Sequence, residues 1–104
     1  MSEYILKYHI GQLVAHNKFA YRGVVYDADA QFTGSDEWYE TVATSRPPKD
    51  APWYHVLVDG ENSTTYVAER HLQASLDYTP IRHHLIDVYF SDFDNKQYIL
   101  ARQQ

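Results

Sequence analysis

The sequence predicts a mainly β domain, and three observations support this prediction. Residues 21–29 and 53–58 are rich in β-branched and aromatic side chains, in the patterns that strands require. An Asp-Gly pair at 59–60 separates the second stretch from another one, as in a hairpin turn. The length of 104 residues fits one modest core. We therefore expect residues 1–104 to form a single domain.

The first two predicted strands cover residues 12–16 and about 21–29. Alternation places Val24 and Tyr26 on one face of the second strand, and Val25 with two aspartates on the other. Because carboxylates mark a solvated face, we expect Val24 and Tyr26 to face the core. Gly23 predicts a bulge or a close approach of another backbone segment.

A long segment, residues 30–52, comes next. Ser35 is the expected N-cap of a short helix, because two acidic residues follow in its first turn. Trp38, Tyr39 and Val42 give this helix an apolar side. Three prolines near the end of the segment predict an extended loop, since proline fits neither a helix interior nor a central strand.

The remaining elements follow from the same patterns. Residues 53–58 and 64–69 are expected to form a hairpin, and residues 70–79 a turn and connector. Apolar residues at helical spacing predict a short helix at about 83–93, and residues 97–101 a last strand that closes the sheet. About five short strands with one or two inserted helices predict a small SH3-like barrel.

Composition narrows the classes of function. The chain has no cysteine, which excludes disulfides, thiolate metal sites and a cysteine nucleophile. The formal net charge is −5 and the nine Lys and Arg residues are scattered, which weighs against strong nonspecific nucleic-acid binding. No stretch approaches the roughly 18 apolar residues that span a bilayer, and the first residues do not resemble a secretory signal. We expect a cytoplasmic protein.

The sequence gives little support for catalysis. The histidines lack the spacing of common metal sites, so we expect no metal and no cofactor. Asp27 and Asp29 share a strand face, but no nucleophile accompanies them, and a solvated face explains them better than acid–base chemistry. We expect no catalytic residues, and a protein that is not an enzyme. The six histidines are His9, His16, His55, His71, His83 and His84.

Aromatic residues make up 15% of the chain, which favours a binding surface as well as a core. Small barrels bind peptides or bases in aromatic grooves, and we expect at least one predicted ring to be exposed in such a groove. Core packing is the competing interpretation for each aromatic residue. The predicted ligand contacts, for a protein or for DNA, are Tyr21, Arg22, Trp53, Tyr54, His55, Tyr66, His16 and Lys18.

Three blocks of the sequence, in this order, resemble the HspQ / YccV-like family. They are residues 10–16 followed by 21–29, then residues 51–59, then residues 65–69 continuing to 72. The resemblance implies a small bacterial, stress-associated (heat-shock) protein with no established catalytic residues. It further implies an adaptor or specificity enhancer for ATP-dependent proteases such as ClpXP and Lon.

The same resemblance implies an alternative, the binding of hemimethylated DNA in the regulation of replication-initiator levels. That function requires a positive patch, for which the candidates are Lys18, Arg22, Arg46 and Lys49. The negative net charge favours a protease or client protein as the partner. Spare edge strands also favour a homo-oligomer.

Overall fold

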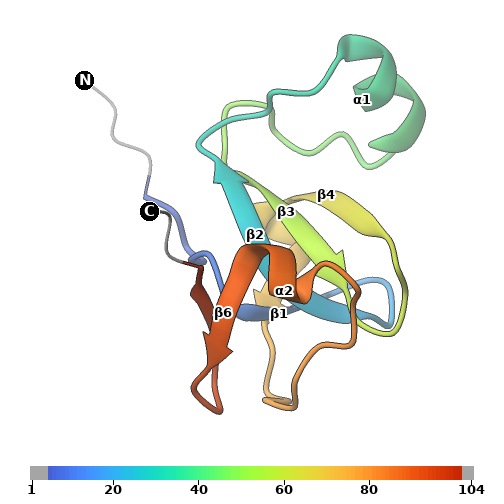
Figure 1. The fold of residues 1–104 in the computed structure, drawn as a ribbon. Helices are drawn as coiled ribbons and strands as arrows, with labels where there is room; N and C mark the ends of the chain where they lie inside the picture. Colours follow the sequence, from blue (N-terminus) through green and yellow to red (C-terminus); the bar gives the residue numbers. More distant parts are fainter. Residues whose placement is uncertain (1–4, 102–104) are drawn as a thin grey trace.

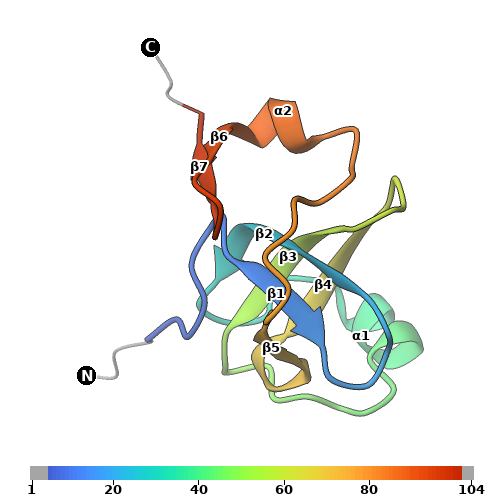
Figure 2. The same ribbon diagram turned by 90° about the horizontal axis from the view of Figure 1, so that it is seen from below.

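The computed structural model describes residues 5–101, and it is mainly β (Figures 1 and 2). An antiparallel sheet has the strand order β4-β3-β2-β1-β5. Its strands are β1 (Leu13–His16), β2 (Arg22–Asp29), β3 (Trp53–Val58), β4 (Thr64–Ala68) and β5 (Leu72–Ala74). A second ladder pairs β6 (Phe90–Phe93) with β7 (Tyr98–Leu100). The short helices are α1 (Asp36–Val42), the 3-10 turn η1 (Glu69–His71) and α2 (Ile86–Tyr89).

The predicted mainly β fold with short inserted helices is confirmed. Its sheets are not closed into a barrel, because within residues 5–101 the edge strands β4 and β5 each pair on one side only. The 3-10 turn η1 connects the edge strand β4 to the opposite edge strand, β5. No helix of the described residues is long and apolar enough to cross a membrane.

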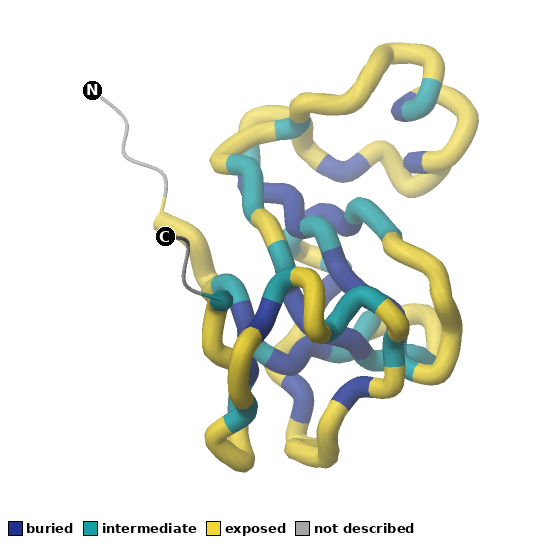
Figure 3. Tube along the Cα trace, viewed as in Figure 1, coloured by how far each residue is buried: buried dark blue, intermediate teal, exposed yellow. Residues whose placement is uncertain are grey.

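Both faces of the main sheet are covered, and Figure 3 shows the buried positions gathered along it. Val24 and Val25 are adjacent in β2, point to opposite faces, and are both fully buried. The prediction that Val25 lies on a solvated face was wrong, because the C-terminal ladder and α2 pack on one face while β5 and the N-terminal segment complete a core on the other. Burying a valine stabilises the fold by about 1.5–3 kcal/mol.

Gly23 lies where two strands approach closely. A Cβ at this position would stand 2.3 Å from the carbonyl oxygen of Leu57 on β3. The expected close approach is therefore present at Gly23, whereas the irregularity in β2 lies three residues later, between Val25 and Asp27.

Helix α1 and the proline loop form a unit against the end of the sheet. Ser35 caps the helix as expected, its Oγ accepting the N–H of Trp38 at 3.1 Å. The Tyr39 hydroxyl donates to the Pro47 carbonyl at 2.6 Å, and the Trp53 indole N–H donates to the Pro48 carbonyl at 3.0 Å. The first of these two bonds joins the loop to α1, and the second joins it to β3.

The C-terminal third differs from the prediction. The helix expected at 83–93 is only one turn, and its second half is strand β6. The expected final strand pairs with β6 instead of closing the main sheet, although an isolated bridge joins Gln12 to Gln97. The fifth strand of the main sheet is β5, inside the segment expected to be a connector; three residues are too few to show alternation.

Candidate functional site

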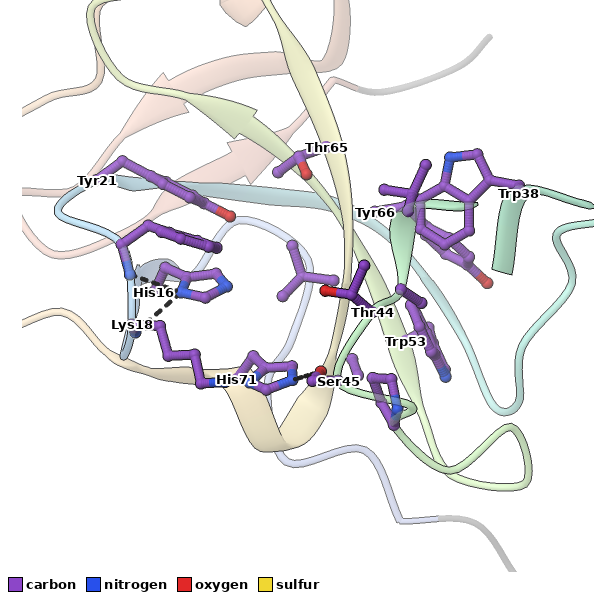
Figure 4. Close-up of a pocket in the computed structure, with 16 residues that line it drawn as sticks. His16, Lys18, Tyr21, Trp38, Thr44, Ser45, Trp53, Thr65, Tyr66 and His71 are labelled. Atoms are coloured by element: carbon purple, nitrogen blue, oxygen red, sulfur yellow. Dashed lines mark hydrogen bonds between the residues drawn. The ribbon is translucent and has the colours of Figure 1, made fainter. Parts of the chain in front are cut away.

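A groove of about 240 Å³, called here the β4 groove, follows strand β4 (Figure 4). Four consecutive β4 residues, Thr65 to Ala68, line it. On one side lie the β1–β2 turn and η1, and on the other lie α1 and the loop after it. The sheet positions the first side and the anchored loop positions the second.

The first side carries the basic groups of the groove. His16 Nδ1 accepts the backbone N–H groups of Lys18 and Phe19, each at 3.0 Å. The His16 ring stacks on the His71 ring, with centroids 5.6 Å apart and planes 8° apart. His71 Nε2 in turn lies 2.8 Å from the Ser45 hydroxyl.

The environment favours neutral imidazoles on this side. Burial, the neighbouring His71 and the charge of Lys18 lower the pKa of His16. Burial, Arg70 and Lys18 lower the pKa of His71 in the same way. Burial also raises the pKa of Tyr21, an effect that the Thr65 hydroxyl partly offsets. At neutral pH the formal charge on this side is therefore the single ammonium group of Lys18.

The second side is aromatic. The ring of Tyr66 lies 5.2 Å from that of Trp53 and 5.8 Å from that of Trp38, measured between centroids. Phe32 stands behind them, 4.9 Å from Trp53. Trp53 is 2% exposed and so forms the base of the groove, whereas Trp38 and Tyr66 are half-buried and present ring surface.

A hydrogen-bond network fixes Tyr66 from outside the groove. Asp29 Oδ2 accepts from the Tyr66 hydroxyl at 2.7 Å and from Thr33 Oγ1 at 2.8 Å, and lies 3.1 Å from His55 Nε2. Burial alone would raise the pKa of Asp29, but these three bonds outweigh it and lower that pKa. The aromatic side is thus held in place by an ionised carboxylate that does not line the groove.

Five of the eight predicted contact residues meet in the β4 groove. They are His16, Lys18, Tyr21, Trp53 and Tyr66. His55 lies next to it, with its ring centroid 4.4 Å from that of Tyr66, in an adjoining hollow.

The other two predicted contact residues do not line the β4 groove. Tyr54 is fully buried and donates to Glu69 Oε2 at 2.6 Å, so it cannot touch a ligand directly. Arg22 lies 3.4 Å from both Asp59 Oδ2 and Asp77 Oδ2 and donates to the Thr79 hydroxyl at 2.6 Å. It ties the segment after β5 to the sheet.

The other cations of the predicted positive patch are also paired. Arg46 lies 2.6 Å from Glu40, and Lys49 lies 3.2 Å from Asp36. Together with the pairing of Arg22, this leaves Lys18 as the candidate without an ion pair among the described residues. Three of the four predicted cations therefore have a neighbouring carboxylate that offsets their charge.

Sequence reasoning missed several groove residues. Trp38 was expected only as part of the apolar side of a helix, and nothing in the sequence indicated that it faces β4. His71 lies 55 positions after His16, and only the turn of η1 brings the two rings together. The position of His71 directly after a conspicuous strand was the one signal available.

The comparison with known families covers nearly all of this structure. A sequence model of the YccV-like family, described as "Hemimethylated DNA-binding protein YccV like", matches residues 6–97. The chain belongs to the YccV-like family. The matched range contains β1 to β6 and the whole β4 groove of this YccV-like protein. The resemblance noted from the three sequence blocks is confirmed.

Proposed function

We propose that this YccV-like protein is a non-catalytic, cytoplasmic binding protein that acts as an adaptor or specificity enhancer in ATP-dependent proteolysis of the ClpXP or Lon type. In this proposal the β4 groove contacts the protease or its client. Aromatic rings, hydroxyl groups and one ammonium group line the groove, and none of its lining residues is a carboxylate. This aromatic groove in a chain of net charge −5 is the observation that carries the proposal.

The charges support a protein partner over nucleic acid. Duplex DNA demands several cations directed at phosphates, because neutralising phosphates supplies most of the affinity. Here three of the four candidate cations are paired with carboxylates. Tyrosine and tryptophan surfaces, by contrast, dominate the energetics of protein interfaces.

Degradation of a client by the purified protease, with and without this protein, tests the proposal. Val42 is suited to the test because it lines the groove and is 54% exposed, so Val42→Glu leaves the core intact. We expect Val42→Glu to reduce the enhancement of degradation at least tenfold. Tyr78→Ala, which changes an exposed aromatic residue outside the groove, is the matched control and should keep full activity. Equal activity of the two variants would contradict the proposal.

The family description favours a second candidate, the binding of hemimethylated DNA. Anisotropy titrations with hemimethylated and unmethylated duplexes at two salt concentrations separate the candidates. The adaptor proposal expects no binding at micromolar protein near physiological salt. A preference for the hemimethylated duplex, with affinity that falls steeply as salt rises, would replace the adaptor proposal with the DNA one.

Self-association remains a prediction. Both sheet edges belong to short strands, and equilibrium sedimentation of the purified protein measures whether they pair between copies.

A further inference from the structure

The register of the hairpin shows which backbone groups of β4 face away from the sheet. Val58 donates to the Ser63 carbonyl at 3.1 Å, and Glu69 donates to the Pro52 carbonyl at 3.0 Å. In an antiparallel ladder hydrogen-bonded pairs alternate with non-bonded pairs, so Thr65 and Val67 also bond to β3. The N–H and C=O groups of Thr64, Tyr66 and Ala68 therefore point away from β3, at the outer edge of the sheet. Ala68 is buried against α1 and the loop after it, so the accessible part of this edge is at Thr64 and Tyr66.

This outer edge runs along the β4 groove. Neighbouring residues of a strand point to opposite faces, yet Thr65, Tyr66, Val67 and Ala68 all line the groove. A groove lined by both faces must follow the strand edge itself. Figure 4 shows this arrangement, with the His16 and His71 rings to one side of β4 and Trp38 with Tyr66 to the other.

The two faces of a strand added in the groove would therefore contact different surfaces. Tyr66 points to the face that carries Trp38, and their ring centroids lie 5.8 Å apart. Thr65 points to the opposite face, where its hydroxyl meets Tyr21 next to His16 and Lys18. An extended segment beside β4 would place alternate side chains against an aromatic surface and against a basic one.

Charge limits what the basic side can accept. It offers one ammonium group and no carboxylate, which suits a single negative charge better than a polyanion. A chain terminus is usually held by free backbone N–H groups, but the N–H groups of Lys18 and Phe19 already bond to His16. The complementary group is thus the side-chain carboxylate of an internal Asp or Glu.

We propose that an extended segment of a partner protein adds to the free edge of β4 as a further strand, with apolar side chains against Trp38 and Tyr66 and a carboxylate beside Lys18. This inference rests on the proposed function because it uses the same groove. It adds the chemistry of the partner segment. The partner segment alternates apolar and polar residues, one of the polar residues is acidic, and the segment is bound by its backbone as well as its side chains.

The test uses the full-length protein and synthetic peptides. The probe is an acetylated, amidated hexapeptide that alternates three valines with two serines and one glutamate, so that it carries the single negative charge that the groove suits. Amide hydrogen exchange by NMR should show slow exchange at Thr65 and Val67 in the free protein and fast exchange at Thr64 and Tyr66. Saturating peptide should slow exchange at Thr64 and Tyr66 at least tenfold. Binding that leaves these two amides unchanged would overturn the inference.

Matched peptides and variants test the chemistry. A block peptide of the same composition, with the three valines first and the two serines and the glutamate after them, keeps the charge, and it should bind at least tenfold more weakly. Lys18→Glu should weaken binding of the alternating peptide at least threefold, whereas Lys96→Glu, outside every groove described, should leave it unchanged. Equal affinities for the two peptides, or equal effects of the two variants, would contradict the proposed contacts.

The remaining outcomes are also decisive. Exchange at Thr64 and Tyr66 that is slow at high protein concentration and speeds up on dilution would mean that a second copy covers the edge, which overturns the peptide proposal. Protection of the same amides by a DNA duplex would overturn it too. If the peptides fail while Val42→Glu still abolishes the enhancement of proteolysis, strand addition is wrong and the adaptor function stands.

Discussion

At the residue scale, Gly23 has almost no room for a side chain. A methyl group there would meet the Leu57 carbonyl oxygen at 2.3 Å and the Val56 Cγ1 at 2.6 Å, in the centre of a fully buried strand pair. Backbone atoms cannot rotate away as the end of a flexible side chain can. We expect Gly23→Ala to lower the free energy of unfolding by about 3 kcal/mol.

Urea denaturation measures this cost, and Gly60→Ala is the control. Gly60 has φ near +80° but nothing closer than 3.5 Å to an added Cβ, so its cost of about 1 kcal/mol comes from the backbone conformation alone. A Gly23 variant no less stable than the Gly60 variant would contradict the close packing of β2 on β3.

His16 gives the fold a pH dependence at the same scale. Burial, His71 and Lys18 hold its pKa below the ordinary 6.5, so the unfolded chain takes up the proton first. Stability therefore falls as pH drops below about 6.5 and stops falling once His16 is protonated in the folded state. His71 contributes in the same direction.

His16→Asn isolates this contribution, because the Asn side-chain oxygen replaces Nδ1 as acceptor for the N–H groups of Lys18 and Phe19 and does not titrate. We expect thermal melts between pH 7.5 and pH 5 to show a smaller loss of stability in the variant than in the parent protein. An unchanged pH profile would mean that folding does not lower the pKa of His16.

At the scale of elements, the best-predicted parts are those with local signals. The β3–β4 hairpin follows from alternation and from Asp59-Gly60, and α1 follows from the Ser35 cap. The last strand, β7, was predicted, but β5, β6 and the pairing of β7 with β6 were missed, because tertiary packing decides them. The apolar spacing of residues 85–93 fits a helix. Residues 90–93 form strand β6 instead, because Phe90 and Tyr98 pack on the sheet.

The residues of the candidate site were likewise predicted only where a local sequence pattern indicated them. Strand patterning pointed to Tyr66 and Trp53, and the β1–β2 turn pointed to His16 and Lys18. Trp38 lies on α1, and two hydrogen bonds, from Tyr39 to Pro47 and from Trp53 to Pro48, hold α1 and the loop after it in place. No sequence pattern indicates these bonds.

Helix α1 can be weakened without touching the groove. The Ser35 hydroxyl caps Trp38, and losing such a cap costs about 1 kcal/mol. We expect Ser35→Ala to raise amide exchange rates in α1 about fivefold while β2 and β3 stay protected. Ser35→Asp, which restores a capping oxygen, should reverse the effect. Uniform loss of protection over both the helix and the sheet would show that α1 does not open independently.

At the scale of the whole molecule, a net charge of −5 surrounds a groove without carboxylates. This contrast favours a partner that offers apolar side chains with one negative charge, and it disfavours a polyanion. The family description nevertheless names DNA, so the nature of the partner is the central question.

The most direct measurement places a photo-crosslinking side chain at position 42, at the mouth of the β4 groove, and offers purified protease with its client and a hemimethylated duplex in one mixture. Our account predicts crosslinks to polypeptide, which the alternating peptide should compete away. Crosslinks to the duplex, undiminished by the peptide, would contradict it.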